Sequence, residues 1–276
     1  MMMNVDFLKP VNVRNKIRLG NNYDGGYIVY GKGLSDIDML LTYGVGWDVQ
    51  FEADLNTRCG TNVLMFDPTM FGKTMLDLKK LAAMLKSLRM YAAGKYIFSI
   101  WQFWKIKRHL EKKGVVFNNE GLAKVNRPKY STFAGHLERF GLKNKRLMLK
   151  IDIEGDEYDV LDDEFMHNLN CVDQLIIEFH SLDRRIDELH YIIRKLKKDF
   201  NLIHIHGNNF ENSFTYNKQE GNINERIEIP IVLECTFLRR SVIAETDIIY
   251  EPVTYPIENL DYPNNLLKED IMLRFI

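Results

Sequence analysis

The sequence lacks an excess of charge of either sign, and it has few cysteines. Its 276 residues include 37 lysines and arginines against 38 aspartates and glutamates, which leaves a formal net charge of -1. A chain without a global basic field is not predicted to bind nucleic acid. The three cysteines, Cys59, Cys171 and Cys235, form no CxxC pair, so neither a disulfide framework nor a zinc knuckle is expected. This cysteine usage favours a reducing, cytoplasmic location.

Long apolar runs are also missing. The most apolar stretch, residues 96–104, is far shorter than the roughly 20 residues that a membrane-spanning helix needs. The first ten residues contain Asp6, Lys9 and Pro10, which do not fit the apolar core of a secretory signal. The sequence therefore predicts neither a transmembrane segment nor a secretory leader.

The chain does contain an alternation of short apolar runs and helical stretches, with 46% hydrophobic and 27% charged residues overall. Repeats, low-complexity segments and glycine/serine linkers are absent, so we expect a single domain spanning residues 1–276. Strands are expected at 39–43, 62–66, 146–151, 174–179, 202–205 and 229–238, and helices at 49–58, 158–169 and 182–200. Buried strands separated by helices indicate an α/β fold with a parallel sheet and helices on both faces. Ligands of such sheets bind beyond the carboxyl ends of the strands.

Residues 73–126 interrupt this alternation, and we expect them to form a helical insertion. The part from Lys73 to Lys113 holds eleven basic and two acidic residues, a net charge of +9, so the rest of the chain carries -10. It is also rich in tyrosine, phenylalanine and tryptophan. Three roles fit this composition: an amphipathic element packed on the domain, a lid or platform for an anionic substrate, or a patch that faces a membrane surface or a second subunit of a homo-oligomer.

A glycine-rich turn follows the first expected strand, in the segment Tyr43-Gly44-Val45-Gly46-Trp47-Asp48. Glycines at this place let the backbone approach a ligand closely and lead into a helix whose amino end favours anionic groups. The turn is not a dinucleotide fingerprint, because Val49 stands where the third glycine would fall.

Two further turns carry candidate ligand-binding residues. Asp67 ends the second expected strand directly before Pro68, and an acid at this place commonly accepts hydrogen bonds from ribose hydroxyls. The alternative for Asp67 is a turn or cap role. Near the start of the chain, Asp24-Gly25-Gly26 predicts a tight turn, and Arg18, Asp24 and Tyr27 around it are candidates to close over a ligand.

The densest polar cluster is Lys150-Ile151-Asp152-Ile153-Glu154, whose charged side chains alternate and so share one side of the strand. Glu178 and His180 end the next strand, and His204 and His206 end the one after it. Buried carboxylates need a partner, and Asp, Glu and His together are typical ligands of a divalent cation. The alternative is that these groups are hydrogen-bonded and structural.

The segment from Lys150 to Leu161, together with Ser131-Thr132-Phe133 before it, resembles the FkbM-type S-adenosylmethionine-dependent methyltransferases. That family carries a Lys-Ile-Asp-x-Glu-Gly-x-Glu-x-x-x-Leu strand and helix, preceded by a Thr-Leu-Asp-like stretch. Phe133-Ala134 replaces the Leu-Asp part of that stretch here. The resemblance covers roughly residues 15–70 and 127–240, and it does not extend to 73–126.

The resemblance implies a seven-stranded, Rossmann-like methyltransferase fold that binds S-adenosylmethionine across the first two strand ends. It implies that Ser131 and Thr132 lie near the adenine. The residues expected to contact the cofactor are Asp24, Tyr43, Gly44, Gly46, Asp48, Asp67, Pro68, Ser131 and Thr132.

The histidines are more typical of metal-assisted O-methyltransferases. We therefore hypothesise that Asp152, Glu178, His180 and His206 hold Mn²⁺ or Mg²⁺, and that Glu154 or His180 acts as the base. The acceptor is expected to be a polar, anionic small molecule such as a nucleotide-sugar, a sugar phosphate or a phosphate-like precursor of a capsular polysaccharide.

Two other functions remain open at this point. A nicotinamide-dependent oxidoreductase would use a similar sheet, although Val49 argues against it. A non-catalytic membrane-surface or scaffold protein would use the basic, aromatic segment on a degenerate methyltransferase core.

Overall fold

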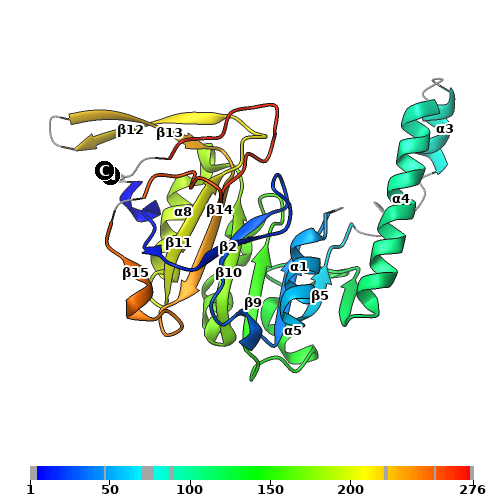
Figure 1. Cartoon of the computed structure of the whole chain (residues 1–276), viewed down its shortest axis with the longest axis horizontal. Coiled ribbons are helices and arrows are strands. Elements are labelled where there is room, and N and C mark those ends of the chain that lie inside the picture. The colour runs from blue at the N-terminus through cyan, green and yellow to red at the C-terminus, as the bar shows by residue number, and fades with distance from the viewer. Residues whose placement is uncertain are drawn as a thin grey trace.

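A seven-stranded sheet forms the centre of the computed structural model, which describes residues 5–46, 48–69, 78–86, 90–220, 223–251 and 253–273 (Figure 1). In spatial order the strands are β11 (Phe200–Gly207), β14 (Leu233–Arg239), β10 (Val172–Phe179), β9 (Leu147–Ile151), β4 (Met39–Tyr43), β5 (Asn62–Phe66) and β6 (Val115–Asn118). β14 is antiparallel to both of its neighbours, and the other strands are parallel.

The strand order creates a crevice beside β4. The chain passes from β4 outward to β5 and β6, and later returns to β9 on the opposite side of β4. Ligands of α/β sheets bind at such a reversal, beyond the carboxyl ends of the strands. This order, with one antiparallel strand near an edge, confirms the expected Rossmann-like, seven-stranded sheet.

Helices cover both faces of the sheet. On one face α5 (Phe133–Arg139), α7 (Asp163–His167) and α8 (Leu182–Leu196) pack on β4, β9 and β10, with Phe133, Phe165 and Leu189 in the shared core. On the other face α1 (Gln50–Cys59) packs with the hairpin of β2 (Lys16–Leu19) and β3 (Tyr27–Tyr30). These apolar layers explain the continuous burial of the central strands.

The remaining elements are short. They are the 3-10 helices η1 (Val5–Leu8), η2 (Leu34–Asp36), η3 (Leu169–Cys171) and η4 (Glu245–Asp247), the helix α6 (Glu157–Val160), and the strand pairs β1 (Asn12–Val13) with β15 (Ile248–Ile249) and β7 (Gly121–Leu122) with β8 (Tyr130–Ser131). The expected helix at 158–169 is therefore divided, because the Asp162 side chain accepts a hydrogen bond from the Phe165 amide and begins α7.

The expected strand at 229–238 was wrong as one element. Its first residues end β13 (Ile223–Pro230), which pairs with β12 (Ser213–Glu220) in a separate hairpin, and the rest forms β14. Pro230 ends β13, and residues 231 and 232 connect it to β14. Figure 1 shows this hairpin beyond the sheet, and no apolar run marks its two strands in the sequence.

The interval 73–126 is not helical throughout. Its described helices are α3 (Leu78–Lys86) and α4 (Met90–Glu111), whereas residues 115–118 form β6 of the central sheet. Gly114 has a φ of 85°, a left-handed conformation that ends the helical path, and the Val-Val-Phe run after it favours a strand. Trp47, residues 73–77 and residues 87–89 lie outside the described part. Within the described part, no helix combines the length and apolar character needed to span a bilayer.

Candidate functional site

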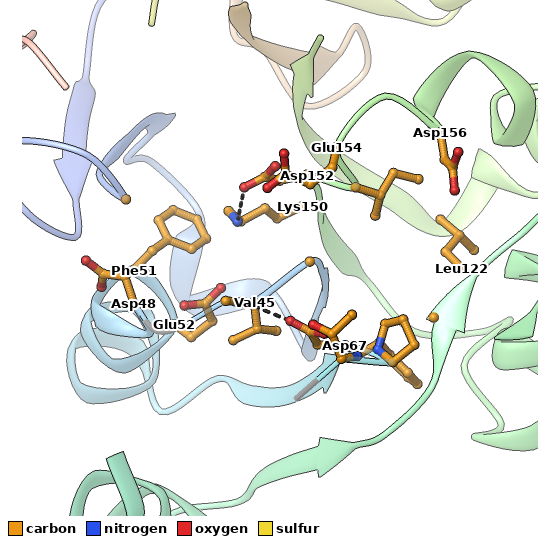
Figure 2. Close-up of a pocket in the computed structure, with 18 of the residues that line it drawn as sticks. Val45, Asp48, Phe51, Glu52, Asp67, Leu122, Lys150, Asp152, Glu154 and Asp156 are labelled. Carbon is orange, nitrogen blue, oxygen red and sulfur yellow. Dashed lines mark hydrogen bonds and ion pairs between the residues drawn. The ribbon is translucent and has the colours of Figure 1, made fainter. Parts of the chain in front are cut away.

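A cavity of about 460 Å³ lies at the carboxyl ends of β4, β5 and β9 (Figure 2). Lys150 and Asp152 lie on one side of it, and Val45 and Asp67 lie on the other. The described lining consists of Asp24, Gly25, Tyr27, Gly44, Val45, Gly46, Asp48, Phe51, Glu52, Phe66, Asp67, Pro68, Thr69, Gly121, Leu122, Tyr130, Lys150, Asp152, Ile153, Glu154 and Asp156. The pocket therefore occupies the crevice that the strand order creates.

The glycine turn after β4 forms one wall. Gly44 has a φ of 77°, and a Cβ at this position would lie 1.5 Å from the carbonyl oxygen of Asp152. Only glycine permits this approach between the ends of β4 and β9. Gly46 has a φ of 60°, and a Cβ there would meet no atom within 4 Å. The turn thus presents bare backbone to the pocket.

Asp67 connects this turn to the end of β5. Its Oδ2 accepts a hydrogen bond from the Gly46 amide at 3.0 Å. Its Oδ1 accepts from the amide and the hydroxyl of Thr69, at 2.7 and 2.6 Å. Asp67 is only 3% exposed as a residue, yet it lines the cavity. Asp67 therefore has the turn role and also the position from which ribose hydroxyls can be bound.

Six of the expected cofactor residues meet at this pocket, namely Asp24, Gly44, Gly46, Asp48, Asp67 and Pro68. Three others are not among its described lining residues. Tyr43 is buried, and its hydroxyl lies 2.9 Å from Nδ1 of His136. The Thr132 hydroxyl caps α5 by accepting from the Gly135 amide, and the Ser131 hydroxyl lies 3.1 Å from Oδ1 of Asn126.

Leu122 and Tyr130 line the pocket where Ser131 and Thr132 were expected. They come from the two-residue strands β7 and β8, which pair in parallel. Strands of two residues are too short to show the alternation of apolar and polar residues by which a strand is recognised in a sequence. The sequence signal for this wall is limited to the position of Tyr130 directly before the Ser-Thr pair.

Lys150 is the basic side chain of the described lining, against seven carboxylates. These are Asp24, Asp48, Glu52, Asp67, Asp152, Glu154 and Asp156. The Lys150 ammonium lies 3.7 Å from Oδ2 of Asp152 and 4.8 Å from the ring centre of Tyr27. Burial alone would lower the pKa of Lys150, but Asp152, Glu52 and Glu178 outweigh it and raise the pKa. Lys150 therefore stays charged.

Asp152, Glu178 and His180 form a compact cluster. One ligand atom of each lies within 4.8 Å of the others. Nε2 of His180 is 3.9 Å from Oδ1 of Asp152 and 3.9 Å from Oε1 of Glu178. The opposite ring nitrogen, Nδ1, lies 3.0 Å from Oε1 of Glu157. Glu157 thereby fixes the ring so that Nε2 points toward the two carboxylates.

Burial and the neighbouring charges shift the pKa values of all three residues in this cluster. Burial raises the pKa of Glu178, and the nearby carboxylates Asp152 and Glu234 raise it further. Burial also raises the pKa of Asp152, although Lys150 and His180 oppose the change. Burial alone would lower the pKa of His180, but Glu157 and the other carboxylates raise it to about 9. Burial and mutual repulsion thus disfavour the charged carboxylates, and a bound cation would offset both effects.

The donor set fits a divalent cation. Two carboxylates and one imidazole are ligands that Mn²⁺ accepts, and a carboxylate that holds the far ring nitrogen is the usual outer support of a ligating histidine. Oε1 of Glu178 also accepts a hydrogen bond from the side-chain amide of Asn208 at 2.9 Å. Oε2 of Glu178 accepts one from the Tyr27 hydroxyl at 3.2 Å. A carboxylate oxygen has two lone pairs, so these bonds leave room for an ion.

His206 is not part of this cluster. The expectation that it is the fourth ligand of the cation was therefore wrong. β14 lies between β10 and β11, and Glu234 of β14 pairs in register with Glu178 on one side and His206 on the other. Nδ1 of His206 lies 3.2 Å from Oε2 of Glu234, and Nε2 lies 3.1 Å from Oδ1 of Asp270. His206 instead joins the C-terminal segment to the sheet.

The substitution His206→Gln is expected to lower the free energy of unfolding by about 3–5 kcal/mol at neutral pH, because the buried carboxylate of Glu234 and the partly buried one of Asp270 lose their cation. Burial would lower the pKa of His206, but hydrogen bonds to Asp270 and Glu234 raise it to about 10. An unfolded histidine titrates near pH 6.5. The stabilisation is therefore complete below about pH 6.5 and is lost as the pH rises toward 10.

Urea unfolding of both proteins across this pH range measures the effect. The difference between the native protein and His206→Gln should narrow steadily above neutral pH. His109→Gln, at an exposed position of α4, serves as the control and should change little. If the difference in free energy of unfolding between the native protein and His206→Gln did not vary with pH, it would contradict the prediction that His206 is charged.

Comparisons with known proteins add little at the level of sequence. No protein-family model matches this sequence, and no curated protein is a significant match. Among solved structures, a precorrin-6y C5,15-methyltransferase from Geobacter metallireducens is similar over 74% of this chain and 80% of its own, with 10% identity and a TM-score of 0.30. A protein assigned as an RNA methyltransferase from Pyrococcus horikoshii is similar over 85% of this chain and 95% of its own, with 12% identity and a TM-score of 0.28.

Proposed function

We propose that this protein is an S-adenosylmethionine-dependent O-methyltransferase that uses a divalent cation. The observation that carries the proposal is the pocket at the reversal of strand order. Its walls combine the bare Gly44–Gly46 backbone with the carboxylate of Asp67 at the next strand end. Dinucleotide enzymes use the same crevice, but Val49 removes the third glycine on which they rely.

The charges of the residues that line the pocket suit S-adenosylmethionine. S-adenosylmethionine carries a positive sulfonium and a positive amino group beside one carboxylate. A pocket with seven carboxylates and one lysine among its described residues stabilises such a ligand. Asp67 would accept hydrogen bonds from the ribose, and the glycine turn would allow the cofactor to lie directly on the backbone.

Asp152, Glu178 and His180 would hold the cation. Bound there, it would lower the pKa of an acceptor hydroxyl and fix the direction of the oxygen. The remaining task is to remove a proton and align the acceptor with the methyl group. Glu154 is the proposed base, since its side chain is exposed at the pocket, and its Oε2 lies 3.9 Å from Nε2 of His180. His180, the other expected base, would have both ring nitrogens engaged, Nδ1 by Glu157 and Nε2 by the cation, which leaves Glu154 to accept the proton.

The acceptor is proposed to be a polar small molecule that carries a phosphate-like anion, such as a sugar phosphate or a nucleotide-sugar. An anion beside so many carboxylates fits this pocket only when a divalent cation offsets their charge. Binding of an anionic acceptor is therefore expected to depend on the cation, whereas binding of a neutral polyol is not.

Calorimetric titration with S-adenosylhomocysteine tests the proposal. The chelator-treated protein should bind this product, and Mn²⁺ should give a separate heat. Asp67→Ala is expected to weaken S-adenosylhomocysteine binding by about tenfold to 100-fold, since hydrogen bonds to a charged group contribute about 1.5–3 kcal/mol. Asp156→Asn, another carboxylate of the lining, is the matched control.

Failure of the native protein to bind S-adenosylhomocysteine, with or without Mn²⁺, would contradict the methyltransferase proposal. Binding of a reduced nicotinamide cofactor under the same conditions would favour the oxidoreductase alternative. Equal effects of Asp67→Ala and Asp156→Asn would place the cofactor away from the end of β5.

A further inference from the structure

The helix α4 presents a continuous exposed stripe. Met90, Ile97, Phe98 and Trp101 are exposed by 65%, 48%, 53% and 56%. Lys105 and Arg108 continue the same face toward the carboxyl end of the helix, three to four residues apart. We name these six residues the outer stripe. Ala93 and Ile100, which flank the stripe, and Leu110, on the opposite side of the helix, are buried, so α4 packs beside and behind the stripe.

The outer stripe is held away from the body of the molecule. Figure 1 shows α3 and α4 as a projecting pair beside β5, with the carboxyl end of α4 leading back to the sheet. α4 contacts α3 and β6. None of the described residues covers the outer stripe, and four large apolar side chains in one exposed row mark an interaction surface.

Charge identifies the kind of surface that the stripe fits. The segment from Lys73 to Lys113 carries +9, whereas the rest of the chain carries -10. An anionic surface would attract the projecting pair and repel the body. The molecule is thus oriented before contact, with its helical projection toward that surface.

The side chains are arranged as in helices that lie at a lipid interface. Phe98 and Trp101 stack with their ring centres 5.8 Å apart, and the Lys105 ammonium lies 5.4 Å from the centre of the Trp101 ring. Aromatic rings favour the headgroup level of a bilayer, and lysine stems extend along apolar surface to reach phosphates. The helix lacks the apolar length to span a bilayer, so it fits the surface rather than the interior.

We propose that α4 docks the protein on an anionic phospholipid bilayer. Met90, Ile97, Phe98 and Trp101 enter the interface, and Lys105 and Arg108 contact lipid phosphates. This binding is independent of the proposed methyl transfer, because the outer stripe shares no residue with the pocket.

Sedimentation of the whole chain with vesicles tests the proposal. Vesicles of equal parts phosphatidylglycerol and phosphatidylcholine should bind the protein at low salt and release it at high salt, and pure phosphatidylcholine vesicles should bind it weakly. The double variant Phe98→Glu/Trp101→Glu should weaken binding to the anionic vesicles at least tenfold. Leu267→Glu, at a position 94% exposed on the C-terminal segment, is the matched control and should bind as the native protein does.

A second double variant, Lys105→Glu/Arg108→Glu, keeps the test decisive if the first variant misfolds. It lowers the charge of the segment from +9 to +5, so it should weaken the salt-sensitive part of binding at least tenfold and leave the unfolding midpoint unchanged. Binding of either folded variant equal to that of the native chain would overturn the proposal, as would no binding to the anionic vesicles. A lipid-free dimer that Phe98→Glu/Trp101→Glu converts to a monomer would overturn it in favour of a second copy.

Discussion

Gly44→Ala is expected to cost about 4–5 kcal/mol or more of folding free energy, an effect confined to the most severe single substitutions. The added methyl would lie 1.5 Å from the carbonyl oxygen of Asp152, a backbone atom that no side-chain rotation can move. That backbone is fixed from both sides, because the Asp152 amide donates to the Tyr43 carbonyl at 3.0 Å and the Gly44 amide donates to Phe66 at 3.0 Å. Total stability of a domain is about 5–15 kcal/mol, so little folded protein should remain.

Gly46→Ala provides the matched control. Gly46 also has a positive φ, but its added methyl would meet no atom within 4 Å. Its cost should be limited to the backbone strain, about 1–2 kcal/mol. Urea unfolding of the two variants measures the difference, and similar midpoints would contradict the close approach of β4 and β9. The folded Gly46→Ala protein should still bind S-adenosylhomocysteine less tightly, because its methyl projects into open space at the pocket wall.

The sequence alone predicted the centre of the sheet well, for a physical reason. Residues 39–43 and 62–66 were expected as strands and form β4 and β5 with the same bounds. Both are short apolar runs between turn-forming residues, and a strand buried on both faces requires such a run. Because the carboxyl ends of parallel strands share one edge, the expectation that Asp152 meets Glu178 and His180 followed from the same pattern.

The predictions that failed concern residues and strands whose position depends on pairing between strands that lie far apart in the sequence. His206 was grouped with His180 because both follow apolar strands. Their separation depends on β14, a strand from later in the chain, inserting between β10 and β11. The hairpin β12–β13 was missed because polar cross-strand contacts contribute to it. The hydroxyls of Ser213 and Thr215, for example, donate to Glu228 at 3.0 and 2.6 Å.

Local capping explains the difference at the expected adenine end of the pocket. Thr132 was assigned from a resemblance, but its hydroxyl begins α5 by accepting from Gly135. An N-cap threonine has its side chain turned toward its own helix, and here the neighbouring Tyr130 lines the pocket instead. A resemblance in residue order cannot distinguish a cap from a ligand contact, because both use the same residue type at a strand–helix junction.

Asp152→Asn is expected to weaken Mn²⁺ binding by at least about 100-fold, since even substitutions in the outer support of metal sites cost tenfold to 100-fold. The Asp152 carboxylate faces both Nε2 of His180 and the ammonium of Lys150. An amide in its place keeps the shape but removes the charge that attracts a cation. Asp156→Asn makes the same charge change in an exposed carboxylate of the same pocket, outside the cluster, and should leave Mn²⁺ binding within a few-fold of the native value.

Calorimetric titration of each variant with Mn²⁺ and with S-adenosylhomocysteine distinguishes a loss of cation binding from a loss of cofactor binding. Asp152→Asn should lose the heat of Mn²⁺ binding and retain that of S-adenosylhomocysteine, because the Gly44–Gly46 turn and Asp67 are unchanged. Loss of both heats would mean that Asp152 supports the pocket as a whole through Lys150, whose charge it balances at 3.7 Å. Equal Mn²⁺ binding by the two variants would exclude the cluster as the cation site. The acceptor hydroxyl would then depend on Glu154 for its deprotonation, and turnover should respond to Glu154→Gln but not to chelators.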